Sequence, residues 1–183
     1  MYTSISEFIE EWNQEAESTQ RVLDALTDQS LQQEVSPNDR TLGRLAWHIV
    51  TSTPGMLNEF GISVQLVEQS DNVPTSAKKI ADTYRALSIN AAEAVRQQWM
   101  DESLKEKKEV FFREMQKAAM LSLLMKHIIH HRGQMTILMR QAGLTVPGIY
   151  GLAAKNGAKS EWKLQKYKKA LKFKRGSSKM KLP

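Results

Sequence analysis

The chain has 183 residues, no cysteine and a formal net charge of +6. This length is typical of one domain that buries its own core without disulfides. The lack of cysteine excludes thiolate metal sites, cysteine nucleophiles and iron–sulfur clusters.

The N-terminal segment does not resemble a signal peptide. Its first 25 residues carry six acidic side chains and no unbroken apolar run. No apolar stretch of the chain approaches the length of a membrane span. We therefore expect a soluble cytoplasmic protein.

The first predicted helix covers about residues 4–26, where apolar side chains recur at steps of three and four. Ser4 is the predicted N-cap, and Glu7 completes a capping box. The polar stretch 28–38 that follows, which contains a proline, predicts a loop.

The second predicted helix begins at about Asp39. Proline removes a backbone donor and clashes with the preceding turn, so we expect Pro54 to kink or break this helix. The helical pattern resumes over 56–60 and is expected to stop at Gly61. Residues 61–74 read as irregular.

The third predicted helix follows Thr75 or Ser76 as its cap, and its apolar stripe reaches Trp99. The charged stretch 101–109 predicts a loop, and 110–112 a short extended piece.

The fourth predicted helix is the most apolar and covers about 117–141, with Gly143 ending it. Methionines at helical spacing are typical of core filling, and this helix carries Met120, Met125, Met135 and Met139. Four amphipathic helices without a strand pattern predict an all-α fold, an up-and-down or crossover four-helix bundle. The connection between the second and third helices is long enough for a crossover.

The end of the chain is strongly basic. Residues 155–183 carry eleven Lys or Arg and one acid, a net charge of +10, whereas residues 1–154 have a net charge of −4. We therefore divide the chain into a bundle at 1–152 and a basic C-terminal extension at 153–183, partly helical over about 160–174 and disordered at its end. The extension could contact nucleic acid, a membrane surface or a partner subunit, or it could only aid solubility.

Three of the four histidines lie in the last helix. His127 and His131 are four residues apart, which places both imidazoles on one face, one turn apart. Two imidazoles at this spacing can chelate one metal ion.

His48 lies on the inward face of the second helix, between Leu45 and Ile49. A buried imidazole needs partners for both ring nitrogens. One interpretation is a core histidine bonded to a backbone carbonyl or to Ser52, one turn away. The other is a third ligand beside the histidine pair. Three histidines with an open position are typical of a catalytic site, and imidazoles suit zinc, nickel, copper or iron(II).

Three neighbours of the histidine pair are candidates for supporting roles. His130 points about 100° away from His131 around the helix, where it could serve as a proton carrier or face solvent. Gln134 shares the face of His127, and could bind a metal-bound water or only pack. Arg132 could pair with an acid of the first helix or bind an anionic substrate.

Two segments resemble the DinB/YfiT-like superfamily of metal-dependent enzymes. The first is His127-x-x-x-His131-Arg-Gly-Gln with the Leu-x-Val-Pro-Gly-Ile-Tyr-Gly string at 144–151, and the second is Leu-Ala-Trp-His-Ile around His48. The resemblance covers roughly residues 1–152, and the longer basic extension departs from it.

The resemblance implies an up-down-down-up four-helix bundle, often a homodimer, with one divalent metal held by His48, His127 and His131. It implies nickel or zinc as the usual metal, and iron is a further candidate. Some relatives resemble thiol S-transferases that use low-molecular-weight thiols such as bacillithiol or mycothiol, and others resemble maleylpyruvate isomerases. The family name refers to DNA-damage-inducible expression and does not imply DNA binding.

Three hypotheses of function follow. The first is a metal-dependent transferase or hydrolase that acts on a small molecule. The second is a non-catalytic metal-binding module of a stress response, in which the metal is structural or sensed. The third is a nucleic-acid or membrane adaptor that acts through residues 155–183.

Overall fold

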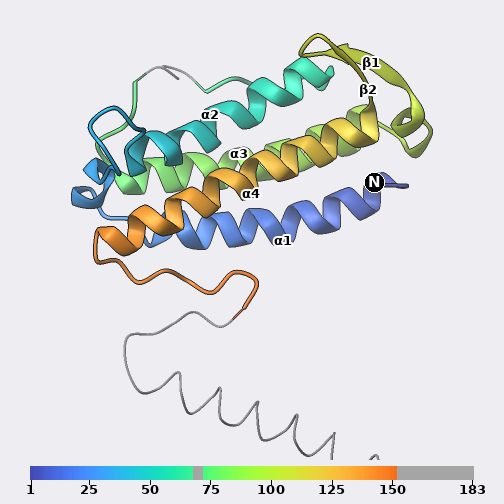
Figure 1. Ribbon diagram of the computed structural model, residues 1–183. Coiled ribbons are helices and arrows are strands. Elements are labelled where there is room, and N and C mark those ends of the chain that lie inside the picture. Colours follow the sequence, from blue (N-terminus) through green and yellow to red (C-terminus); the bar gives the residue numbers. More distant parts are fainter. Residues whose placement is uncertain (68–71, 152–183) are drawn as a thin grey trace, which may run out of the picture. The chain divides into compact units, whose positions relative to one another are not determined.

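Four long helices lie side by side in the computed structural model, which describes residues 1–67 and 72–151 (Figure 1). They are α1 (Ile5–Asp24), α2 (Leu42–Phe60), α3 (Ala77–Gln98) and α4 (Lys117–Gln141). The predicted all-α four-helix bundle is confirmed. None of the helices in these two ranges combines the length and apolar character that crossing a bilayer requires.

The helices follow the up-down-down-up order. In Figure 1, α1 and α4 run in one direction and α2 and α3 run in the other. Helices α2 and α3 pack against each other and are parallel. Helices α1 and α2 do not pack as a pair; each packs against both α3 and α4.

Hydroxyl side chains begin three of the helices. Ser4, Thr41 and Ser76 each accept a hydrogen bond from the backbone N–H three residues later. The predicted cap at Ser4 is confirmed, but the predicted start of α2 at Asp39 is wrong. The Asp39 carboxylate accepts a hydrogen bond from Ser36 Oγ at 2.7 Å, which closes a turn ahead of the helix.

Helix α2 is continuous through Pro54, so the predicted break does not occur. Both sides of the proline are anchored in the core, Val50 before it and Leu57 after it, each with no exposed surface. Their burial holds both halves of α2 to neighbouring helices despite the missing backbone donor. Gly61, with φ 95°, ends the helix as predicted.

A β-hairpin replaces the loop predicted at 101–109. A short 3₁₀ helix, η2 (Asp101–Lys105), leads into β1 (Lys107–Val110), which pairs antiparallel with β2 (Arg113–Gln116). The two residues between the strands have positive φ, 51° and 62°, as in the turns that suit two-residue hairpins. Both are phenylalanine rather than Asn or Gly, and the strands are mostly charged, so the usual hairpin signals are absent.

The core lies between the four helices. The four methionines of α4 are buried, which confirms their predicted packing role. Trp12 of α1 is also buried, and its Nε1 donates to the backbone oxygen of Ser88 in α3 at 2.9 Å. A second 3₁₀ helix, η1 (Gln29–Gln32), packs against α2.

The division of the chain at 152 stays a prediction. Contacts group the chain into Met1–Pro147 and Gly148–Pro183. The predicted helix at about 160–174 and the predicted disorder after it lie outside the described residues.

Candidate metal site

Three imidazoles meet where α2 faces α4. His48 comes from α2, and His127 and His131 come from successive turns of α4. The ring centroids are 5.1 Å apart for His48 and His127, 4.6 Å for His48 and His131, and 4.5 Å for His127 and His131. Each ring offers one nitrogen, and these atoms all lie within 4.8 Å of one another. The structure therefore brings the three predicted ligands together.

Two of the nitrogens are spaced as if around one ion. His48 Nε2 lies 3.2 Å from His127 Nε2. Two nitrogens that each lie about 2.05 Å from a common zinc ion, at a tetrahedral angle of about 109°, would be about 3.3 Å apart. The donor set and its spacing thus fit a divalent transition metal.

The hydrogen bond of His131 leaves its other nitrogen available. His131 Nδ1 lies 2.8 Å from Gln134 Oε1. Since an amide oxygen can only accept, Nδ1 carries the proton and Nε2 keeps a free lone pair. This arrangement is common around metal-binding histidines, where a partner on one nitrogen fixes the ring and its tautomer. Gln134 therefore touches the imidazole itself, which the sequence analysis did not consider.

Packing alone does not account for the polar atoms of this cluster. Ser52 Oγ has no hydrogen-bond partner among the described residues, so the alternative in which His48 bonds Ser52 is not formed. His127 Nδ1 is also buried, and it has no hydrogen-bond partner among the described residues. Unpaired buried polar atoms are costly and uncommon, and they are more typical of a functional site than of a core.

The imidazoles are held in the neutral state that binds metals. Burial, followed by the neighbouring charges of His131 and Arg40, lowers the pKa of His48 to about 4. Burial and its histidine neighbours lower the pKa of His127 to about 4 as well. Burial also lowers the pKa of His131, against the opposing effect of Gln134. At neutral pH, little proton release is needed before a metal ion binds.

His130 and Arg132 are not among the three clustered histidines. His130 is exposed, and its ring centroid lies 5.0 Å from that of His131. Arg132 is only 1% exposed, and its Nη2 donates to Glu15 Oε2 at 2.5 Å. The predicted pairing of Arg132 with an acid of the first helix is confirmed, and its alternative role in binding a substrate is not supported.

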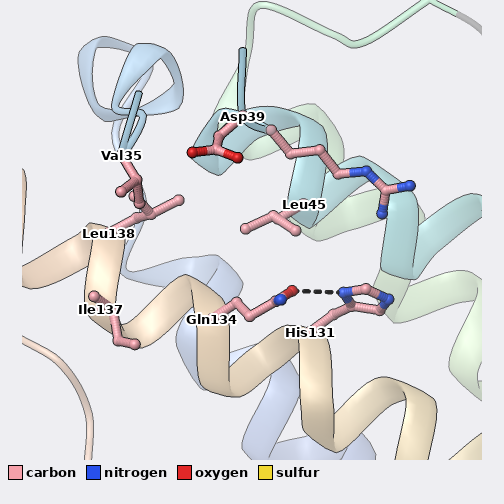
Figure 2. A pocket seen from close by; sticks show the side chains of 8 residues that line it. Val35, Asp39, Leu45, His131, Gln134, Ile137 and Leu138 are labelled. Carbon is pink, nitrogen blue, oxygen red and sulfur yellow. Dashed lines mark hydrogen bonds between the residues drawn. The ribbon is translucent and has the colours of Figure 1, made fainter. Parts of the chain in front are cut away.

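A pocket of about 390 Å³ opens beside His131. Figure 2 shows His131 and Gln134 on one wall, with Leu45 and Asp39 across from them. The complete lining is Val35, Asp39, Arg40, Leu45, His131, Gln134, Ile137 and Leu138. The sequence analysis missed the three residues from the loop before α2, because charged and apolar residues in a polar loop have no periodicity that indicates a pocket.

The chain is similar to known proteins over most of its length. The model of the DinB family matches residues 1–166, which extends into the basic segment. The uncharacterized protein YrdA of Bacillus subtilis (strain 168) is 43% identical over 162 residues, which are 88% of this chain and 94% of YrdA.

Two solved structures share the fold. The crystal structure of a DinB-like protein from Bacillus cereus ATCC 10987 is 49% identical, with a TM-score of 0.78 over 82% of this chain and 100% of that one. The DinB-like protein YjoA of Bacillus subtilis is 21% identical, with a TM-score of 0.62 over 78% of this chain and 96% of that one, and its likeness concerns the fold alone. On the family match and the identity to YrdA, this chain belongs to the DinB family.

Proposed function

We propose that the chain binds one divalent transition metal through His48, His127 and His131 and uses it to transform a small molecule. The observation that carries the proposal is the convergence of three neutral imidazoles, each with one nitrogen within 4.8 Å of the others. Three protein ligands are fewer than a closed structural site provides, so a position stays open for water or substrate.

When bound, such an ion lowers the pKa of a water or thiol ligand and polarises it for transfer or hydrolysis. The protein residues do the remaining work. Gln134 fixes the orientation and tautomer of His131. The pocket beside His131 gives a small molecule access to the open side. Exposed His130 lies close enough to relay a proton to solvent.

The resemblance favours nickel or zinc over iron, and a low-molecular-weight thiol as one substrate. It also favours a homodimer, and the N-terminal sequence favours a cytoplasmic location. We retain these as parts of the proposal. The pocket volume supports the small-molecule part, because about 390 Å³ suits a compact ligand and not a macromolecule.

Metal content measured by elemental mass spectrometry tests the site. We expect near-stoichiometric metal in the wild type and loss of most of it in His48→Ala, His127→Ala and His131→Ala. His130→Ala is the matched control, because it removes an imidazole from the same helix outside the cluster, and it should keep its metal. Full retention in any of the first three variants would remove that residue from the ligand set.

A measurement of turnover distinguishes the enzyme hypothesis from that of a non-catalytic metal-binding module. We expect thiol-transfer or hydrolase activity that disappears with chelator and in His127→Ala. A chelator that lowers the melting temperature, in a protein without turnover in either screen, would instead favour the metal-binding module.

A further inference from the structure

Two oppositely charged residues, Asp39 and Arg40, line the pocket, and they differ in their hydrogen-bond partners. The Asp39 carboxylate accepts a hydrogen bond from Ser36 Oγ at 2.7 Å. Arg40, the next residue, lines the same pocket, and in the part of the chain that the structure describes it makes no hydrogen bond or ion pair. The pocket therefore offers guanidinium donors that no described residue occupies.

Arg40 and His131 line the same pocket, so Arg40 carries a positive charge beside the proposed metal site. A fixed cation at this position also opposes the charge of a bound metal ion. This repulsion is relieved if an anion lies between the two cations, because opposite charges attract.

The rest of the lining is suited to a short apolar linker. Leu45 faces the pocket from α2, and Ile137 and Leu138 line it from α4 (Figure 2). These residues line the same pocket as His131 and Arg40. A ligand in the pocket would thus meet a metal-binding group, apolar side chains and a cation.

We infer that Arg40 is a ligand-binding residue that selects small molecules carrying a carboxylate in addition to the group that reaches the metal. The inference rests on the proposed metal site and adds the ligand class. A guanidinium matches a carboxylate with two parallel hydrogen bonds. Gln134 is held by His131 and does not compete for that carboxylate.

Two thiols of matched size test the inference on the full-length protein loaded with cobalt(II). The probes are 3-mercaptopropionate and its neutral amide, 3-mercaptopropionamide, and the readout is the thiolate-to-cobalt absorption band. We expect the carboxylate to bind roughly tenfold more tightly than the amide, the effect of one charge-assisted pair. Arg40→Gln should abolish the difference without changing the cobalt content, and Arg40→Lys should keep part of it.

Arg44→Gln is the control, because Arg44 is also exposed but does not line the pocket, and it should keep the preference. Equal binding of the two thiols by cobalt-loaded wild type would overturn the role of Arg40 and leave the metal site intact. An unchanged preference in Arg40→Gln would do the same. Wild type that takes up no cobalt would overturn the metal site and this inference together.

Discussion

Polar side chains enter the bundle from two sides of α4, and the two sets differ in their hydrogen-bond partners. Toward α1, the buried Arg132 donates to the backbone oxygen of Glu15 at 3.0 Å, to Thr19 Oγ1 at 3.1 Å and to the Glu15 carboxylate. Toward α2, the imidazoles face one another, and His127 Nδ1 is buried without a partner among the described residues. The hydrogen-bonded Arg132 joins α4 to α1. The histidine cluster still has a nitrogen without a partner, so it can bind a ligand.

The comparison is informative because His131 and Arg132 are adjacent in sequence. A step of about 100° around the helix separates a residue of the candidate site from a residue of the structural network. Substitutions on the Arg132 side should therefore act on stability, and substitutions on the histidine side should act on metal binding. The predictions below test this division, beginning with the largest expected effect.

Arg132→Met should lower the free energy of unfolding by about 3–5 kcal/mol, because the largely buried Glu15 carboxylate loses its guanidinium partner. Urea denaturation of the metal-free protein measures this change. Arg21→Met is the control, since Arg21 pairs with Glu17 at the surface of α1, and the expected change is within about 1 kcal/mol. A loss for Arg132→Met no larger than that of the control would refute its structural role.

Gln134→Ala should weaken metal binding by about 10- to 100-fold, because His131 loses the partner that orients its ring. Competition against a chromophoric chelator measures the affinity. The stability of the metal-free protein should change by less than about 0.5 kcal/mol, since Gln134 is exposed. Gln141→Ala, at the exposed end of the same helix, should leave the affinity unchanged, and an equal affinity in both variants would contradict the prediction.

The metal-free protein should lose stability as the pH falls from about 6.5 towards about 4. Over this range the histidines of the unfolded chain take up protons, while His48 and His127 in the folded chain, with pKa values of about 4, stay neutral. The unfolded state then binds more protons, so acid favours it, and above the ordinary histidine pKa this contribution is fully present and constant. Urea midpoints across the range measure the slope.

His127→Leu should change the free energy of unfolding of the metal-free protein by no more than about 1 kcal/mol, and it could be slightly stabilising. The substitution removes a buried nitrogen that lacks a partner and replaces it with an apolar side chain. It should also flatten the pH dependence and abolish any rise in melting temperature on adding metal. A destabilisation as large as that of Arg132→Met would show that the imidazole is part of the structural framework.

Helical periodicity was sufficient to predict the bundle. The four apolar stripes, the caps at Ser4 and Ser76 and the end at Gly61 match the structure. The start of α2 was wrong because Asp39 and Thr41 are both good caps, and only the bond from Ser36 decides between them. The hairpin was missed because its turn consists of two phenylalanines in the left-handed region, where Asn or Gly is expected.

The residues of the candidate site that lie on helices could be predicted from the sequence, and the residue that lies on an irregular loop could not. His127 and His131 follow from helical spacing, and His48 follows from its place on an inward face. The convergence of α2 on α4 depends on the crossover between α2 and α3, which the resemblance implied and the periodicity alone did not. Arg40 could not be found, because its position depends on how an irregular loop packs beside α4.

The order of the helices also decides when the histidine cluster can form during folding. His48 and His127 are 79 residues apart in sequence, and α4 is the last helix among the described residues. No fragment that ends before α4 contains more than one of the three imidazoles. Closing so long a loop is an entropic cost that only the docked bundle overcomes. An ion that binds all three imidazoles therefore recognises the completed bundle, and its uptake marks the last step of folding rather than an early one.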